Sequence, residues 1–175
     1  MFKKVAIVLT ALIVGVLVFA TTQPDTFRVE RAATIAAAPE RIQPLIADLR
    51  RWSEWSPWEK LDPNMQRTYS GTESGVGSIY EWSGDGSVGA GRMEILAATP
   101  TEVDIQLDFI KPLETRNKAK FVLTPNTAST RVLWSMEGPM PYVTKVMTVF
   151  VSMDTLLSKD FEQGLADLKA AAEKG

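Results

Sequence analysis

The chain has 175 residues, enough for one domain of about 150 residues and a short appendage. Its formal net charge is only −2 and its lysines and arginines do not cluster, so the composition argues against a nucleic-acid partner. The sequence has no cysteine and no histidine, which excludes disulfides, thiolate metal sites, and nucleophilic catalysis of the Ser-His or Cys-His type.

The N-terminal segment, residues 1–22, is predicted to be a membrane anchor or a signal segment. Lys3 and Lys4 precede an uncharged apolar run from Val5 to Ala20. This run is slightly long for a signal-peptide core and slightly short for a membrane span of about 20 residues. A weak cleavage site at Val18–Ala20 favours an uncleaved anchor, and a cleaved signal is the alternative. Both lysines should stay in the cytoplasm. The rest of the chain is therefore expected on the periplasmic or extracytoplasmic side, as a single-pass membrane protein or, after cleavage, as a secreted periplasmic one.

A short linker, residues 23–25, leads into the predicted domain, residues 26–173. From Phe27 to Ala37 apolar and polar residues alternate, which predicts a strand. Pro39 suits the first turn of a helix, and apolar residues at helical spacing continue from there to Trp52. We therefore expect a short helix of about 13 residues after the first strand.

Three of the five tryptophans, Trp52, Trp55 and Trp58, follow this helix in a segment that Pro57 interrupts. The favoured interpretation is that they cap one end of the core under an irregular loop. The alternative is that they line the mouth of an apolar cavity or face a nearby bilayer, because amphipathic rings suit both places.

The middle of the chain predicts six strands joined by turns rich in glycine, which is typical of an antiparallel sheet. The clearest strand runs from Glu102 to Lys111, where apolar and polar residues alternate strictly. The glycine-rich stretch Gly71–Gly77 has no following Lys-Ser/Thr and no helix, so it predicts a hairpin turn and not a phosphate loop. The remaining strands are expected at 67–71, 76–83, 89–98, around 119–123, and at 130–138.

The C-terminal segment from about Tyr142 to Glu173 predicts one long helix. Apolar residues recur at steps of three or four over about eight turns, and charged residues lie between them. The β-branched residues of its first half make the start of this helix less certain than its end. Gly164 lies inside the pattern, where it costs stability unless another side chain packs closely against the backbone.

Several segments together resemble the SRPBCC or START-like superfamily, specifically the bacterial polyketide cyclase/dehydrase and lipid transport group. They are WSEWSPWEKLDPNM (52–65), YSG (69–71), GVGSIYEWSG (75–84), GAGRMEI (89–95) and KDFEQGLADLK (159–169). The resemblance covers about residues 26–172. It implies an α+β helix-grip (START-like) fold, in which a curved antiparallel sheet wraps around a long C-terminal helix, here with an additional N-terminal membrane helix. It also implies an apolar cavity between sheet and helix.

The side chains expected to line this cavity share the inward parity of their strands or the apolar stripe of the long helix. They are Tyr80, Trp82, Met93, Ile105, Leu107, Phe109, Trp134, Met136, Met147, Phe150 and Met153, with Trp55 and Trp58 at the mouth. The same residues would also serve an ordinary packed core.

No catalytic or metal-binding residue is assigned. Glu54, Glu59, Glu81 and Asp85 lie near possible cavity mouths, but carboxylates on loops and outward faces are usually solvated. We therefore expect no cofactor and no proton-transfer role for these four. The leading hypothesis is a membrane-tethered domain that binds a hydrophobic small molecule or lipid. The alternatives are an enzyme of polyketide cyclase or dehydratase type and a structural or interaction module without a ligand.

Overall fold

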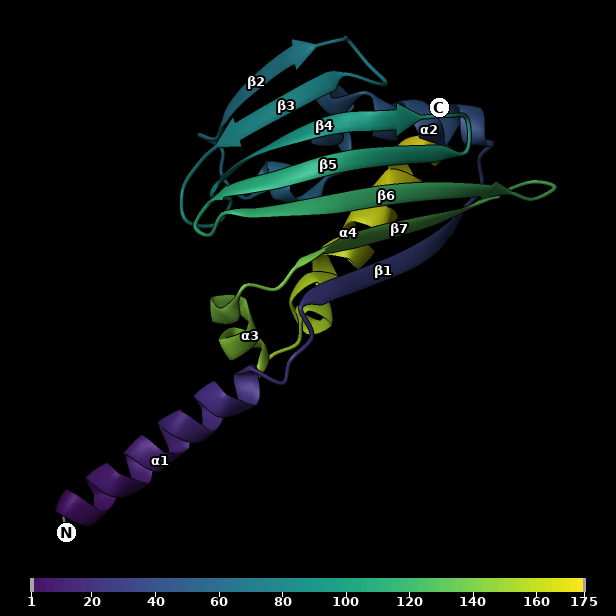
Figure 1. The fold of residues 1–175 in the computed structure, drawn as a ribbon. Coiled ribbons are helices and arrows are strands. Elements are labelled where there is room, and N and C mark those ends of the chain that lie inside the picture. Colours follow the sequence, from purple (N-terminus) through teal and green to yellow (C-terminus); the bar gives the residue numbers. More distant parts are fainter. Residues whose placement is uncertain (1, 175) are drawn as a thin grey trace.

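The computed structural model describes residues 2–174, and its centre is one seven-stranded antiparallel sheet (Figure 1). The strand order is β1-β7-β6-β5-β4-β3-β2, so the first strand of the chain pairs with the last and the other strands follow one another in sequence order. The strands are β1 (Thr26–Ile35), β2 (Gln66–Gly71), β3 (Ser78–Ser83), β4 (Ala90–Ala98), β5 (Glu102–Lys111), β6 (Thr115–Pro125) and β7 (Thr130–Pro139). The prediction of one strand followed by six more is confirmed.

The buried face of the sheet follows the alternation of the sequence. On β5 the side chains of Val103, Ile105 and Leu107 are buried, while those between them are partly exposed. Across the sheet, Phe121 on β6 lies opposite Trp134 on β7, and both are buried. A one-residue shift in register would move these side chains to the solvent face, so the apolar pattern fixes the pairing.

Three helical segments between β1 and β2 and one after β7 cover this face. They are α2 (Pro39–Ala47), two 3-10 helices, η1 (Leu49–Glu54) and η2 (Pro57–Lys60), and α4 (Met153–Glu173) (Figure 1). The inner side of α4 buries Phe161, Leu165, Leu168 and Ala172. The expected α+β helix-grip architecture, a curved antiparallel sheet against a long C-terminal helix, is therefore confirmed.

The prediction of one continuous helix from Tyr142 to Glu173 is wrong. The segment forms a short helix, α3 (Tyr142–Thr148), and the separate helix α4, with a break at 149–152. The break ends at Ser152, whose backbone is extended and whose hydroxyl accepts a hydrogen bond from the Thr155 N–H, so Ser152 caps a new helix. The β-branched residues before it disfavour helix continuation.

This break takes the first half of the apolar stripe away from the core. None of the residues of α3 is buried, and the side chains of Met147 and Phe150 are 59% and 72% exposed. Only the half of the stripe that lies on α4 packs against the sheet.

The N-terminal segment forms one apolar helix, α1 (Phe2–Ala20), which projects away from the domain (Figure 1). It is long and apolar enough to cross a membrane, a property that it shares with signal sequences, and its apolar window is not buried against the domain. Its contacts are with α3, where the Tyr142 hydroxyl donates a hydrogen bond to the carbonyl of Leu17 at 2.9 Å. An ion pair between Lys145 and Asp25 joins α3 to the segment that follows α1.

Candidate functional site

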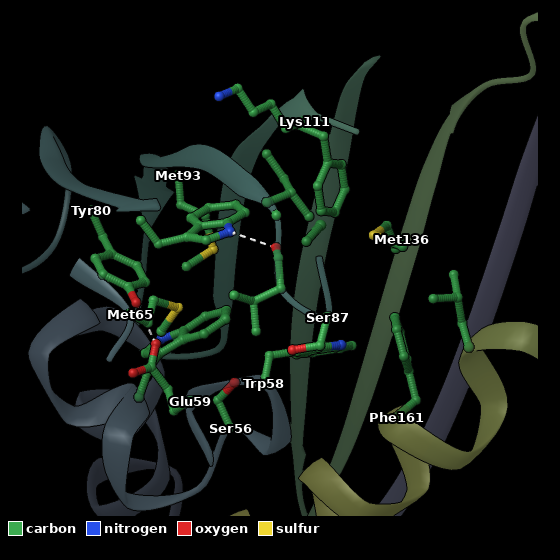
Figure 2. A pocket seen from close by; sticks show the side chains of 18 of the residues that line it. Ser56, Trp58, Glu59, Met65, Tyr80, Ser87, Met93, Lys111, Met136 and Phe161 are labelled. Carbon is green, nitrogen blue, oxygen red and sulfur yellow. Dashed lines mark hydrogen bonds between the residues drawn. The ribbon is translucent and has the colours of Figure 1, made fainter. Parts of the chain in front are cut away.

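A cavity of about 270 Å³ lies between the sheet, the two 3-10 helices and α4 (Figure 2). Aromatic, methionine and other apolar side chains form most of its wall. Its lining residues are Trp52, Ser56, Trp58, Glu59, Met65, Tyr80, Trp82, Gly86, Ser87, Val88, Gly89, Met93, Leu107, Phe109, Lys111, Pro112, Ala119, Trp134, Met136, Leu157 and Phe161. This volume is just below the range of about 300–1,000 Å³ that is usual for ligand sites. The cavity therefore suits a small molecule or one part of a longer one.

Packed aromatic rings hold one wall of the cavity in place. The ring of Trp134 stacks between those of Phe121 and Phe161, with ring centres 5.0 and 4.2 Å away. Trp58 packs edge-on against both Trp134 and Phe161. Rings fixed on several sides cannot collapse easily into the space beside them, so the structure maintains the cavity.

Gly164 on α4 allows this aromatic wall to form. A Cβ at this position would lie 2.8 Å from Cζ3 of Trp134 and 3.2 Å from Cδ of Pro57. The expectation that a glycine here needs a close packing partner is therefore met by the ring that lines the cavity. It also explains why a residue unfavourable in a helix occurs in the middle of α4.

One end of the cavity is polar. The Tyr80 hydroxyl donates a hydrogen bond to Oε1 of Glu59 at 2.5 Å, and Nε of Arg67 lies 2.7 Å from Oε2 of the same carboxylate (Figure 2). The Glu59 side chain is only 6% exposed. Burial, together with the hydrogen bond to Glu59, raises the pKa of Tyr80, so the hydroxyl stays protonated and acts as a donor.

The other end of the cavity is open. Gly86, Ser87, Lys111 and Pro112 are exposed residues of the two connections that border it. In Figure 2, Lys111 lies across the cavity from Glu59, and its amine points away from the interior. The cavity therefore runs from a buried polar end to a mouth at the β3–β4 and β5–β6 connections.

The structure brings eight of the residues predicted from the sequence to this cavity. They are Trp58, Tyr80, Trp82, Met93, Leu107, Phe109, Trp134 and Met136. Ile105 is buried on the same sheet face but does not reach the cavity wall. That these residues bind a ligand stays a prediction.

Four predicted positions are wrong. Met147, Phe150 and Met153 do not line the cavity, because the break before Ser152 places them on α3, in the break, and at the start of α4. Trp55 was expected at the mouth, yet it is fully buried and donates its indole N–H to the carbonyl of Leu45. For Trp55 the interpretation as a cap of the core is therefore the right one.

The expectation that all four carboxylates are solvated is wrong for Glu59. Glu54 pairs with Arg51 at the surface, and this pairing lowers the pKa of Glu54; Glu81 and Asp85 are also exposed. Glu59, in contrast, lies inside the cavity. One signal in the sequence points to it: Tyr80 has inward parity, and a buried phenol needs a hydrogen-bond partner.

Other lining residues differ from the predicted ones, because the helix stripe meets the cavity further along the chain than expected and one residue lies outside strands and helices. Phe161 and Leu157 belong to α4, and Met65 follows η2. The described residues 2–174 contain no group of three or more His, Cys, Asp or Glu side chains placed to hold a metal ion. The chemistry available at the site is apolar burial, ring stacking, and hydrogen bonding, both at the Glu59 end and at the indole N–H of Trp134, which is buried without a hydrogen-bond partner among residues 2–174.

Comparisons with solved structures show where else this fold occurs. A protein of Chromobacterium violaceum, CV1439, is 18% identical over 87% of this chain and 100% of its own, with a TM-score of 0.58. The di-domain ARO/CYC StfQ from the steffimycin biosynthetic pathway is 14% identical, with a TM-score of 0.66 over 85% of this chain and 51% of its own. The di-domain ARO/CYC BexL from the BE-7585A biosynthetic pathway is 15% identical, with a TM-score of 0.63 over 90% of this chain and 54% of its own. The chain thus spans about half the length of these two di-domain proteins.

At these identities the structural matches establish the fold and not the activity. No curated protein matches the chain. The family model described as polyketide cyclase/dehydrase and lipid transport matches residues 26–173, which is most of the sequence and all seven strands. The chain is therefore a member of the polyketide cyclase/dehydrase and lipid transport family.

Proposed function

We propose that this domain binds a hydrophobic small molecule or lipid in the cavity between the sheet and α4, and that α1 holds it at a membrane. The observation that carries the proposal is the cavity itself, an apolar space with one open end whose aromatic walls are fixed by their own packing. Apolar pockets with a few polar groups are the usual form of small-molecule sites. A ligand-free structural module would be expected to fill this space with side chains.

The position of the mouth supports uptake from a membrane. Thr26 pairs with Pro139, and Ala90 pairs with Lys111, at the same end of the sheet. Figure 1 shows α3 beyond this end of the sheet and α1 beyond α3, so both lie on the side where the β3–β4 and β5–β6 connections border the mouth. A ligand that leaves a bilayer around α1 would therefore meet the open end of the cavity.

The surface of α3 and the break gives further support for membrane contact. Val143, Met147, Phe150 and Val151 are all exposed, and they lie next to the helix that is apolar enough to span a bilayer. Exposed apolar side chains gathered at one place indicate an interaction site. We expect lipid to cover them.

The binding proposal can be tested by narrowing the cavity. Ala119 is a buried lining residue on β6, so Ala119→Leu should place additional methyl groups in the space. The matched control is Ala166→Leu on the exposed side of α4. Protein purified from its own host should carry a small apolar molecule that solvent extraction and mass spectrometry detect. Ala119→Leu should lose this molecule and the control should keep it. Wild-type protein that carries nothing, and that also fails to bind added apolar probes, would refute the proposal.

An enzyme of cyclase or dehydratase type is the second candidate, because Glu59 brings one carboxylate into the cavity. Proton transfer requires such a group within hydrogen-bond distance of the substrate. Mass spectrometry of the bound molecule before and after incubation distinguishes the two functions. A binding protein returns it unchanged, whereas an enzyme converts it in a reaction that Glu59→Gln abolishes.

A further inference from the structure

The indole N–H of Trp134 is a buried donor without a hydrogen-bond partner. Among residues 2–174, two buried side-chain atoms lack a partner, Nε1 of Trp134 and Oδ1 of Asn117, and of these two residues only Trp134 lines the cavity. An unpaired buried donor is costly, and native proteins rarely keep one. The N–H of Trp134 therefore indicates an acceptor that comes from outside the chain.

Two other indoles of the cavity wall find their acceptors within the protein. Trp52 and Trp82 donate to the backbone carbonyls of Ile46 and Val88, and both of these carbonyls lie outside the sheet. Trp134, in contrast, lies on β7, which has β1 on one side and β6 on the other. The carbonyls of a strand paired on both sides are used by its neighbours, so the sheet leaves no backbone acceptor for this indole.

The side chains packed around Trp134 supply no conventional acceptor either. Phe121 and Phe161 stack on its faces, and the ring of Trp58 stands at 89° to it. Its six-membered ring meets α4, where Cζ3 would lie 2.8 Å from a Cβ at position 164. Nε1 belongs to the five-membered ring and not to the edge that meets α4. The protein therefore fixes the indole firmly and leaves its donor unused.

A ligand in the cavity approaches this indole from the side of the mouth. Phe121 pairs with Trp134, and Ala119 pairs with Met136 in the next row on the same face, nearer the mouth. Both Ala119 and Met136 line the cavity. Nε1 is buried within the wall at Trp134, and the flexible thioether side chain of Met136 gives this part of the wall freedom to admit one oxygen atom.

The chemistry of the donor selects the group that the ligand presents. An indole N–H donates a hydrogen bond and cannot accept one. A ligand hydroxyl would bring its own donor among the rings of Phe121, Phe161 and Trp58, where it would stay unpaired in turn. A carboxylate would carry a charge into an apolar wall. A carbonyl oxygen avoids both costs, because it only accepts and is neutral.

We propose that the indole N–H of Trp134 donates a hydrogen bond to the carbonyl oxygen of a neutral ketone or ester, whose apolar body extends past Ala119 and Met136 toward the mouth. This inference rests on the proposed function and adds to it the functional group that the ligand carries. In Figure 2, Phe161, which stacks on Trp134, lies across the cavity from Glu59. The carbonyl site is therefore separate from the polar end.

Two probes with the same carbon skeleton test this ligand class. We suggest 2-acetylnaphthalene and 2-ethylnaphthalene, titrated by calorimetry into the full chain in lipid nanodiscs, with Ala119→Leu nanodiscs as the blank. The ketone should bind about tenfold more tightly than the hydrocarbon, because only the ketone gives the buried N–H an acceptor.

Nuclear magnetic resonance then locates the hydrogen bond. Protein labelled with ¹⁵N-tryptophan has five indole N–H groups, one for each tryptophan, and loss of a signal in Trp134→Phe assigns that of Trp134. With 2-acetylnaphthalene this signal should move further to lower field than with 2-ethylnaphthalene. Both probes carry the same aromatic rings, so the difference between the two shifts reports the carbonyl group.

A matched pair of variants connects the preference to this N–H. Trp134→Phe removes the unpaired donor, so the two probes should bind it with about equal affinity. Trp52→Phe removes another indole of the wall, whose N–H already donates to Ile46; it should weaken both probes together and keep the preference of about tenfold. Thermal melts identify variants that do not fold. Where Trp134→Phe does not, the wild-type titrations and the indole signals, assigned through the backbone, decide the question.

The outcomes separate the two proposals. If both probes bind wild type equally, the cavity still binds apolar molecules and the carbonyl site is refuted. That result is expected if the N–H of Trp134 is directed at the ring of Trp55 or Trp58, which both stand edge-on to it. A preference for the ketone that survives in folded Trp134→Phe would also refute the carbonyl site. Failure of both probes to bind wild type would overturn both proposals.

Discussion

Replacing Gly164 with alanine tests whether the aromatic wall of the cavity depends on a position without a side chain. In an ordinary helix this change stabilises the protein by about 0.5–1 kcal/mol. Here the added Cβ would lie 2.8 Å from the Trp134 ring, closer than real Cβ atoms come to other atoms. Trp134 cannot move away freely, because Phe121 and Phe161 stack on its two faces. Overpacking of this kind costs about 1–3 kcal/mol. The net result should be a destabilisation of about 0.5–2 kcal/mol.

The measurement is urea unfolding of the full chain in detergent, with Ala166→Gly as the control. Ala166 is exposed on the same helix, so Ala166→Gly reports the intrinsic difference between the two residues in α4. The control should lose about 0.5–1 kcal/mol. If Gly164→Ala instead raises the free energy of unfolding by the amount that Ala166→Gly lowers it, the aromatic rings can move to make room for the added Cβ, and the reasoning from close packing fails. A destabilised Gly164→Ala should also change probe binding, because the displaced ring of Trp134 lines the cavity.

Three other predictions concern the core, the buried ion pair and α1. Phe161→Ala should lower the free energy of unfolding, measured in urea, by about 3–5 kcal/mol, because Phe161 is fully buried. Phe150→Ala should lower it by less than about 0.5 kcal/mol, and a large loss would contradict the exposed position of Phe150. Arg67→Met should lower the free energy of unfolding by about 2–4 kcal/mol, because it leaves Glu59 buried without its charged partner. Arg51→Met breaks a surface pair and should lower it by about 0–1 kcal/mol. Equal losses would contradict the burial of Glu59. Fractionated cells should hold the full-length chain in the membrane pellet after a high-salt wash, and a shortened soluble form that begins near Thr21 would instead establish a cleaved signal.

The sheet could be predicted because each strand carries its own evidence. Alternation on β5 gives both the strand and the direction of Leu107, and the same parity on β3 and β7 directs Tyr80 and Trp134 to the common face. Parity, however, says only which face a side chain is on. It does not distinguish Ile105, which lies under the core, from Leu107, which lines the cavity. That difference depends on where η1, η2 and α4 cross the sheet.

Glu59 could not be assigned from local pattern, because it lies in the short 3-10 helix η2, where four residues are too few for a periodicity that indicates a direction. Its burial depends on two partners in other elements, Arg67 on β2 and Tyr80 on β3. A carboxylate alone in such a place would be too costly to bury. Only the assembled sheet shows that the pair is complete, and hence that this carboxylate belongs to the cavity.

The failure at the start of the C-terminal helix has a different origin. A stripe of apolar residues at helical spacing shows that one side of a helix avoids water, but not whether protein or lipid covers that side. The stripe predicts that Met147 and Phe150 line the cavity, and the structure leaves both exposed next to α1. The part that does reach the core begins after Ser152, where the N-cap starts α4. If α1 spans a bilayer as we propose, both halves of the stripe are covered, one by the sheet and the other by lipid.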